Sequence, residues 1–98
     1  MEQWLRCEAS PGQFPGELAI TGTTSTGTVF SLFMPESRVI CSRPASEGKP
    51  TDALLRVEVV GQRDNLFVVR LPRQALENGQ FVLVRTDQLQ QEPSQQEK

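Results

Sequence analysis

The sequence contains no histidine and no tyrosine, and lysine occurs only at positions 49 and 98. Without histidine, the serine and threonine hydroxyls lack their usual general base, and neither Lys49 nor Lys98 is placed to replace it in a serine–lysine arrangement. Two cysteines without histidine do not supply the ligands of a zinc site. The carboxylates are scattered singly along the chain. We therefore expect no enzymatic activity, no metal site and no cofactor.

Long apolar runs are also missing. No segment approaches the roughly 20 consecutive apolar residues that a membrane-spanning helix needs. The first residues, Met1 to Trp4, place an acidic residue where a signal peptide carries positive charge. We expect a cytoplasmic protein with no membrane span, in which Cys7 and Cys41 remain free thiols buried as small hydrophobic residues. Whether these two cysteines lie close together depends on the strand order.

Charge is nearly balanced, because 98 residues contain ten basic and twelve acidic side chains. This length predicts one domain. Residues 90–98 contain no apolar residue and are expected to form a disordered polar tail, which leaves 1–89 as a single β domain. Eight of the ten basic residues are arginine, which suits protein interfaces. The net charge of −2 argues against a phosphate backbone as the partner.

Three dense apolar runs dominate the second half of the chain, at residues 54–60, 66–71 and 81–84. They are rich in valine, leucine and phenylalanine, which favour β-strands. The polar residues 61–65 have turn chemistry, so the first two runs should form an antiparallel hairpin.

The first half of the chain predicts three shorter strands, over residues 17–21, 28–34 and 38–42, and residues 3–7 form either an N-terminal strand or a strap across the barrel. The glycine-rich segment 22–27 lacks the lysine and the following helix of a phosphate-binding loop, and we interpret it as a hairpin turn. Phe14 lies in a loop rich in proline and glycine, where its ring is either a plug for one end of the core, which we favour, or an exposed contact. Residues 43–52 form a polar loop that is either mobile or in contact with a partner.

Pro72 is suited to the first position of a helix, residues 73–77 are good helix formers, and Asn78 with Gly79 forms a suitable end. One short helical turn is therefore predicted near Pro72–Asn78. A short helix before a final strand is common in SH3-like barrels, and residues 81–89 (FVLVRTDQL) resemble the last strand and turn of SH3-like barrels found as small accessory subunits. The predicted fold class is all-β, a small single-domain antiparallel β-barrel or sandwich, with the SH3-like barrel favoured.

Each apolar run of the second half carries one arginine, Arg56 and Arg70 within the first two runs and Arg85 directly after the third. Because both faces of these strands are partly apolar, the arginines could gather among exposed aliphatic side chains, as in a partner-binding face. Solvated charges are the alternative interpretation. The candidate partner-binding residues are Arg56, Arg70, Arg73 and Arg85, followed by Arg43 and Lys49 in the polar loop.

We expect a non-catalytic protein–protein interaction module, a small accessory or regulatory subunit of a larger complex. One alternative is a small β-barrel that binds single-stranded nucleic acid, with Phe67 near Arg70 and Phe81 near Arg85 as stacking sites. The absence of a lysine and arginine cluster argues against nucleic acid. A second alternative is a self-associating structural protein that forms a homodimer through its two-sided strands.

Overall fold

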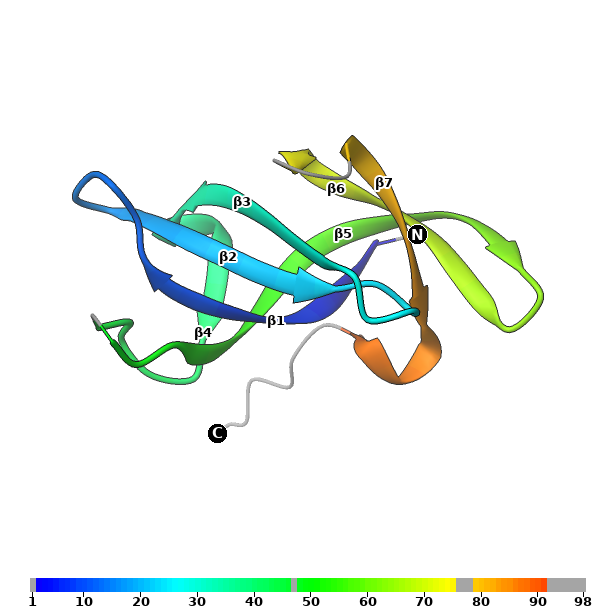
Figure 1. Cartoon of the computed structure of the whole chain (residues 1–98), viewed down its shortest axis with the longest axis horizontal. Helices are drawn as coiled ribbons and strands as arrows, with labels where there is room; N and C mark the ends of the chain where they lie inside the picture. The colour runs from blue at the N-terminus through cyan, green and yellow to red at the C-terminus, as the bar shows by residue number, and fades with distance from the viewer. Residues whose placement is uncertain (1, 47, 76–78, 92–98) are drawn as a thin grey trace.

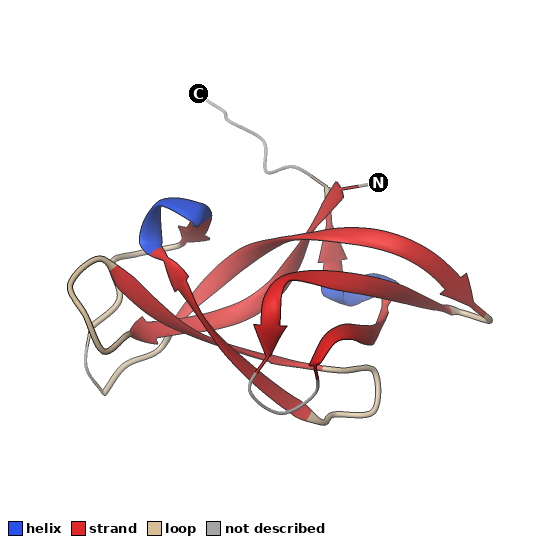
Figure 2. Ribbon diagram, turned by 90° about the horizontal axis from the view of Figure 1, so that it is seen from above, coloured by secondary structure: helices blue, strands red, loops and turns tan. Residues whose placement is uncertain are grey.

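The computed structural model describes residues 2–46, 48–75 and 79–91, and their strands form one eight-stranded antiparallel sheet that curls into a half-barrel (Figures 1 and 2). The strands are β1 (Glu2–Pro11), β2 (Glu17–Thr23), β3 (Val29–Pro35), β4 (Val39–Cys41), β5 (Thr51–Arg63), β6 (Leu66–Ala75), β7 (Gly79–Arg85) and β8 (Leu89–Gln90). Two short 3-10 turns, η1 (Glu36–Arg38) and η2 (Thr86–Gln88), complete the described elements. The predicted all-β class and antiparallel, barrel-like architecture are confirmed.

The long strand β5 organises the sheet, whose order is β3-β2-β1-β5-β6-β7. One edge of β5 pairs with β1 over residues 51–58. The other edge is shared, because β4 pairs with residues 53–55 and β6 pairs with residues 58–63. The predicted hairpin between the first two apolar runs is therefore the β5–β6 hairpin. Its turn includes Asp64, which adopts a left-handed conformation with φ of 56°.

The core lies on the concave face of the sheet, because one side chain in two along each strand points inward. The largest fully buried side chains are Phe30, Leu5, Ile20, Leu32, Leu55, Leu71, Val69 and Val84. Burying each such side chain contributes roughly 1.5–3 kcal/mol. Gly22 is also buried, and a methyl group on its Cα would lie 2.5 Å from Cζ of Phe30. The missing side chain of Gly22 leaves the space that the Phe30 ring fills.

The glycine-rich segment after β2 is a hairpin turn, as predicted, and it also contacts the last strand of the sheet order, β7. β2 and β3 pair in register from Glu17 opposite Pro35 to Thr23 opposite Val29. The backbone N–H of Ser25 then donates to the carbonyl of Leu83 in β7 at 2.8 Å. This bond joins the turn to the far end of the sheet.

Gln88 in η2 makes a second contact between the two ends of the sheet. Its Nε2 donates to the carbonyl of Thr23 at 2.8 Å, and its Oε1 accepts the backbone N–H of Arg85 at 2.7 Å. Gln88 is only 7% exposed, so these bonds satisfy a buried amide. Beyond η2, β8 pairs with β1, with Gln90 opposite Trp4. The prediction that the disordered tail starts at residue 90 is wrong for Gln90, which is paired in β8, and residues 92–98 lie outside the described part of the chain.

The predicted helical turn near Pro72–Asn78 is wrong for residues 72–75, which continue β6 as extended strand, and residues 76–78 lie outside the described residues. The φ angle that proline imposes also fits an extended chain. Pro72 lies where the β6–β7 ladder is interrupted, between Arg70 and Ala75, so its missing N–H breaks no ladder bond there. Nε2 of Gln80 donates to the carbonyl of Leu71 at 3.0 Å and links the two strands instead.

The prediction that Phe14 plugs the core is wrong, because its side chain is 66% exposed. The β1–β2 turn is tightened by two backbone bonds, from Gly12 N–H to the Glu17 carbonyl at 2.8 Å and from Glu17 N–H to the Phe14 carbonyl at 3.1 Å. This turn projects Phe14 beyond the end of the core.

The two cysteines are free, and both lie opposite Ala53, Cys7 in β1 and Cys41 in β4. Two strand spacings separate them, which is too far for a disulfide. Cys7 is buried as expected, whereas Cys41 is only half-buried.

Candidate functional site

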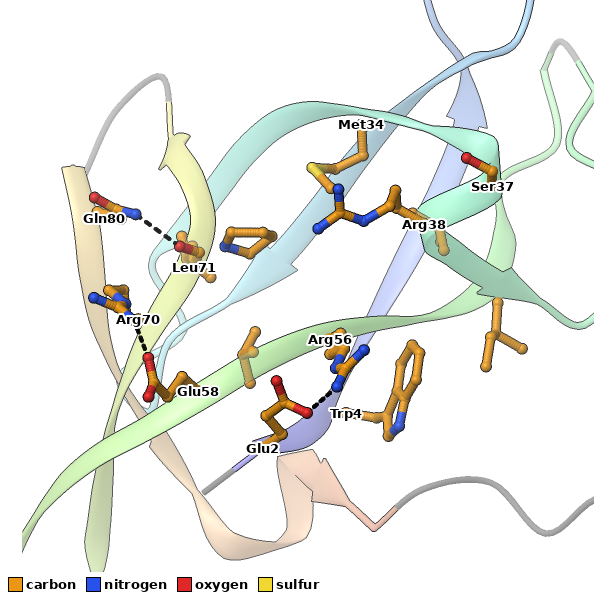
Figure 3. Close-up of a pocket in the computed structure, with 14 residues that line it drawn as sticks. Glu2, Trp4, Met34, Ser37, Arg38, Arg56, Glu58, Arg70, Leu71 and Gln80 are labelled. Carbon is orange, nitrogen blue, oxygen red and sulfur yellow. Dashed lines mark hydrogen bonds and ion pairs between the residues drawn. The ribbon is translucent and has the colours of Figure 1, made fainter.

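A pocket of about 620 Å³ lies at the step where the second edge of β5 passes from β4 to β6 (Figure 3). One side is formed by β3, η1 and β4, and the other by β6 with Gln80 of β7. β5 runs below the opening and β1 contributes its first residues. The pocket therefore follows from the sheet topology, since two strands share one edge of β5.

The floor of the pocket is apolar and belongs to the core. Met34, Val39, Val57 and Leu71 come from four different strands, and their exposed fractions are 2%, 9%, 3% and 1%. None of these side chains carries a charged or strongly hydrogen-bonding group. The floor is therefore suited to an apolar group of a ligand.

The rim carries three arginines and two glutamates. Arg56 of β5 pairs with Glu2 of β1, and Arg70 of β6 pairs with Glu58 of β5 (Figure 3). Arg38 of η1 forms no ion pair with any residue that the structure describes. Three guanidinium groups against two carboxylates leave the rim with a net charge of +1.

Two apolar side chains extend the rim onto the convex face of the sheet. Trp4 is half-buried and lies opposite Arg56 in the β1–β5 register. Ile40 is 39% exposed and lies opposite Leu54. Both line the pocket, so apolar surface continues from the floor to the outside.

The structure brings two of the six predicted partner-binding residues together in this pocket, Arg56 and Arg70. Arg85 lies at the other end of the β6–β7 ladder, where its Nε donates to Asp87 Oδ1 at 3.0 Å and its Nη1 to the Ser25 carbonyl at 3.3 Å. Arg85 therefore links η2 to the turn between β2 and β3.

The other three predicted residues are dispersed. Arg73 is exposed farther along β6 and does not line the pocket. Arg43 lines a separate pocket of about 770 Å³ beside Phe14. Lys49 is exposed in the loop before β5, where it forms an isolated bridge with Ser46. The loop expected over residues 43–52 is shorter than predicted, because β5 begins at Thr51.

Sequence reasoning missed Arg38, Glu2 and Met34 as pocket residues. Residues 38–42 were expected to form a strand, but Arg38 ends η1 and the strand begins at Val39. No local pattern marks these residues, because they meet only when β1, β3 and β5 are assembled.

The aromatic sites proposed for nucleic acid are not equivalent in the structure. Phe67 is half-buried and packs against the core. Phe81 is 57% exposed and lies opposite Arg70 in the β6–β7 register, while Arg85 lies at the far end of that ladder. The exposed ring of Phe81 therefore lies opposite Arg70 and not beside Arg85.

The thiols have little reactivity at neutral pH. Burial raises the pKa of Cys7 from its ordinary value of 9.0 to about 12. The pKa of Cys41 is also raised, first by partial burial and then by the negative charge of Glu36. Both groups are protonated at neutral pH, and the thiolate is the nucleophilic and metal-binding form. The described residues contain no group of three or more histidine, cysteine or acidic side chains that could hold a metal ion.

Within the described ranges, no helix has the length and apolar character needed to cross a membrane. Comparison with protein-family models, with curated proteins and with solved structures finds no match to this chain.

Proposed function

We propose that this protein is a non-catalytic protein–protein interaction module, a small accessory or regulatory subunit of a larger complex, and that a segment of its partner docks in the pocket between η1 and β6. The observation that carries this proposal is the pocket itself. It combines an apolar floor of core residues with an arginine-rich rim, as protein interfaces do.

The surroundings of the pocket support a polypeptide ligand. Trp4 and Ile40 continue the apolar surface beyond the pocket, so a ligand longer than one side chain gains further contacts. Tryptophan and arginine are the residue types that most often dominate binding energy at protein interfaces. The side chains of Arg56 and Arg70 are held by ion pairs, which reduces the conformational entropy that they lose on contact with a partner.

Single-stranded nucleic acid is a second candidate, because Trp4 lies directly opposite Arg56 and could stack a base beside a cation. Glu2 and Glu58 on the same rim oppose this function, since each repels a phosphate. Homodimerisation is the third candidate, based on Val60 and Phe81, which are 47% and 57% exposed.

The experiment is affinity capture of the tagged full chain from its native lysate, with and without nuclease, followed by quantitative mass spectrometry. The pocket variant carries Arg56→Ala and Arg70→Ala, which changes the rim from three arginines and two glutamates to one arginine and two glutamates. Arg73→Ala is the matched control, because Arg73 is exposed on β6 but lies outside the pocket.

We expect nuclease-resistant partners that the wild type and Arg73→Ala retain and that the pocket variant loses. Identical recovery with all three proteins would contradict the proposed docking site. Partners that disappear after nuclease treatment would support the nucleic-acid function instead. A sedimentation measurement on the purified chain identifies a homodimer.

A further inference from the structure

We infer, on the basis of the proposed function, that the pocket recognises a peptide segment that places an apolar side chain on the floor and a nearby carboxylate against Arg38. In this assignment Arg38 determines the specificity of the module for an acidic residue. The inference rests on three observations: the apolar floor, the absence of an ion pair at Arg38 among the described residues, and the position of η1.

The side chains at the bottom of the pocket are apolar, so an apolar group of a ligand fits there better than a polar one. Met34, Val57 and Leu71 present two branched aliphatic side chains and a thioether, and all three are almost completely buried. A polar group placed there would lose its contacts with water without gaining a hydrogen bond from these side chains. Methionine adapts its shape, so the floor can accommodate aliphatic or aromatic side chains of different outlines.

Arg38 differs from the other two arginines of the rim. Arg56 and Arg70 each contact a glutamate, whereas Arg38 is exposed and forms no ion pair among the described residues. Figure 3 shows its guanidinium group beside Met34, at the edge of the floor. A guanidinium group binds a carboxylate through two parallel hydrogen bonds, so a ligand carboxylate at this edge is complementary in charge and shape.

The turn that carries Arg38 is held in place before any ligand binds. The backbone N–H of Glu36 donates to the carbonyl of Gly16 at 2.8 Å, which joins η1 to the β1–β2 turn. The N–H of Val39 donates to the carbonyl of Glu36 and closes η1. The backbone of Arg38 is therefore ordered in advance, and only its side chain loses freedom on binding.

Charge complementarity also selects among anionic ligands. The carboxylates of Glu2 and Glu58 lie on the rim across from Arg38 and each pairs with an arginine, so the uncompensated positive charge of the rim lies on the η1 side. A single carboxylate fits this distribution. A run of phosphates would extend over the two glutamates and be repelled. A peptide with one acidic residue close to an apolar residue is thus favoured over a nucleic-acid strand.

The test begins with a phage-displayed random dodecapeptide library selected on the immobilised full chain at physiological salt. We expect the enriched sequences to carry Asp or Glu within a few residues of a Leu, Ile, Met, Val or Phe. A synthetic peptide of the strongest sequence is then measured by fluorescence polarisation against the wild type, Arg38→Ala and the control Arg73→Ala. Arg38→Ala should weaken binding about tenfold or more, and Arg73→Ala should leave it unchanged.

A double-mutant cycle shows whether the carboxylate contacts Arg38. Replacing the acid of the peptide by its amide should weaken binding to the wild type about tenfold and have almost no effect on binding to Arg38→Ala. Because Arg38 is exposed and unpaired among the described residues, Arg38→Ala should unfold at the same temperature as the wild type.

Enriched peptides without an acid, bound equally by the wild type and Arg38→Ala, would overturn the inference and leave the interaction function in place. A library that yields no enriched peptide overturns the inference as well. If the lysate capture is then also empty, the proposed function fails with it. Tighter binding of a labelled single-stranded oligonucleotide than of any selected peptide would favour the nucleic-acid candidate.

Discussion

The two edges of β5 differ in how they are covered. The first edge pairs with β1 without interruption, from Thr51 opposite Ala9 to Glu58 opposite Glu2. The second edge is divided between β4 and β6, and the candidate pocket lies at the step between them. Continuous pairing on one edge builds the core, while divided pairing on the other leaves a pocket above buried core side chains. The same strand thus contributes to stability and to the candidate site.

The largest effect should come from Leu55, which lies between Leu5 on the first edge and Val39 on the second. Leu55 is completely buried, so Leu55→Ala should lower the free energy of unfolding by about 3 kcal/mol. Leu54→Ala is the matched control, because Leu54 is its neighbour but is only half-buried on the convex face. Urea denaturation measures both. Equal losses for the two variants would contradict the division of β5 into a core face and an outer face.

A smaller loss in the free energy of unfolding is expected for a substitution at Gly22, which lies in β2, next to β1 in the sheet order. The new methyl group of Gly22→Ala would clash with Phe30 at 2.5 Å and contact Cys7 Sγ at 3.1 Å. Relieving this overpacking should cost about 2 kcal/mol, measured by thermal unfolding.

Gly61→Ala is the control for Gly22 on the β6 side of β5. There the methyl group meets only Val68, at 3.8 Å, which is ordinary van der Waals contact. The stability of this variant should change little. A larger loss at Gly61 than at Gly22 would show that the divided edge is the more tightly packed one.

The two edges of β5 can also be compared through the stability of the protein at alkaline pH, because Cys7 and Cys41 lie on either side of Ala53. The pKa of Cys7 is about 12 in the folded protein and near 9.0 when exposed, so the unfolded chain loses this proton first. The stability that the neutral thiol provides is complete below pH 9 and is lost as the pH rises toward 12, by about 1 kcal/mol at pH 10. The chain contains no tyrosine, whose hydroxyl would otherwise titrate in this range.

The measurement is the free energy of unfolding between pH 8 and pH 10.5 or so, in a reducing buffer. Cys7→Ala should flatten the decline with pH. Cys41→Ala should keep most of it, because Cys41 is only half-buried on the divided edge. A decline that survives in Cys7→Ala would have its origin elsewhere in the chain.

The smallest effect on stability is expected for the Arg70–Glu58 ion pair, which lies on the divided edge of β5. In the Arg70–Glu58 pair the side chains are 49% and 42% exposed, so Arg70→Ala should change the free energy of unfolding by less than about 0.5 kcal/mol. The same variant should weaken binding of a verified partner. Chemical denaturation and a binding titration on one preparation separate the two effects. A large loss of stability would assign Arg70 a structural role.

Most of the strands could be predicted from local patterns. Branched and aromatic residues at 54–60, 66–71 and 81–84 correctly indicated β5, β6 and β7, and the polar residues 61–65 marked the hairpin between β5 and β6. The prediction failed at Pro72, because the first position of a helix and an extended strand require similar φ angles. Only the interruption of the β6–β7 ladder decides between them, and that is a tertiary feature.

The candidate site could be predicted only in part. Arg56 and Arg70 belong to neighbouring strands of a predictable hairpin, so their meeting at one pocket follows from local pairing. Arg38 and Trp4 reach the same pocket through the pairing of β4 and β1 with β5, and no sequence pattern specifies those long-range pairings. Arg85 looked equivalent to Arg70 in sequence, but in the structure its guanidinium group donates to the carbonyl of Ser25 in the β2–β3 turn.

The pairing of β8 with β1 also constrains how the protein is made. Leu89 and Gln90 complete the edge of β1 at Leu5 and Trp4, so β1 receives this neighbour from residues that are synthesised more than 80 positions later. A nascent chain on the ribosome must therefore carry that part of β1 uncovered until residue 90 has emerged. Uncovered strand edges pair readily with other chains, and closures between distant segments form slowly. Premature termination in η2 should consequently yield a product that chaperones retain or proteases remove.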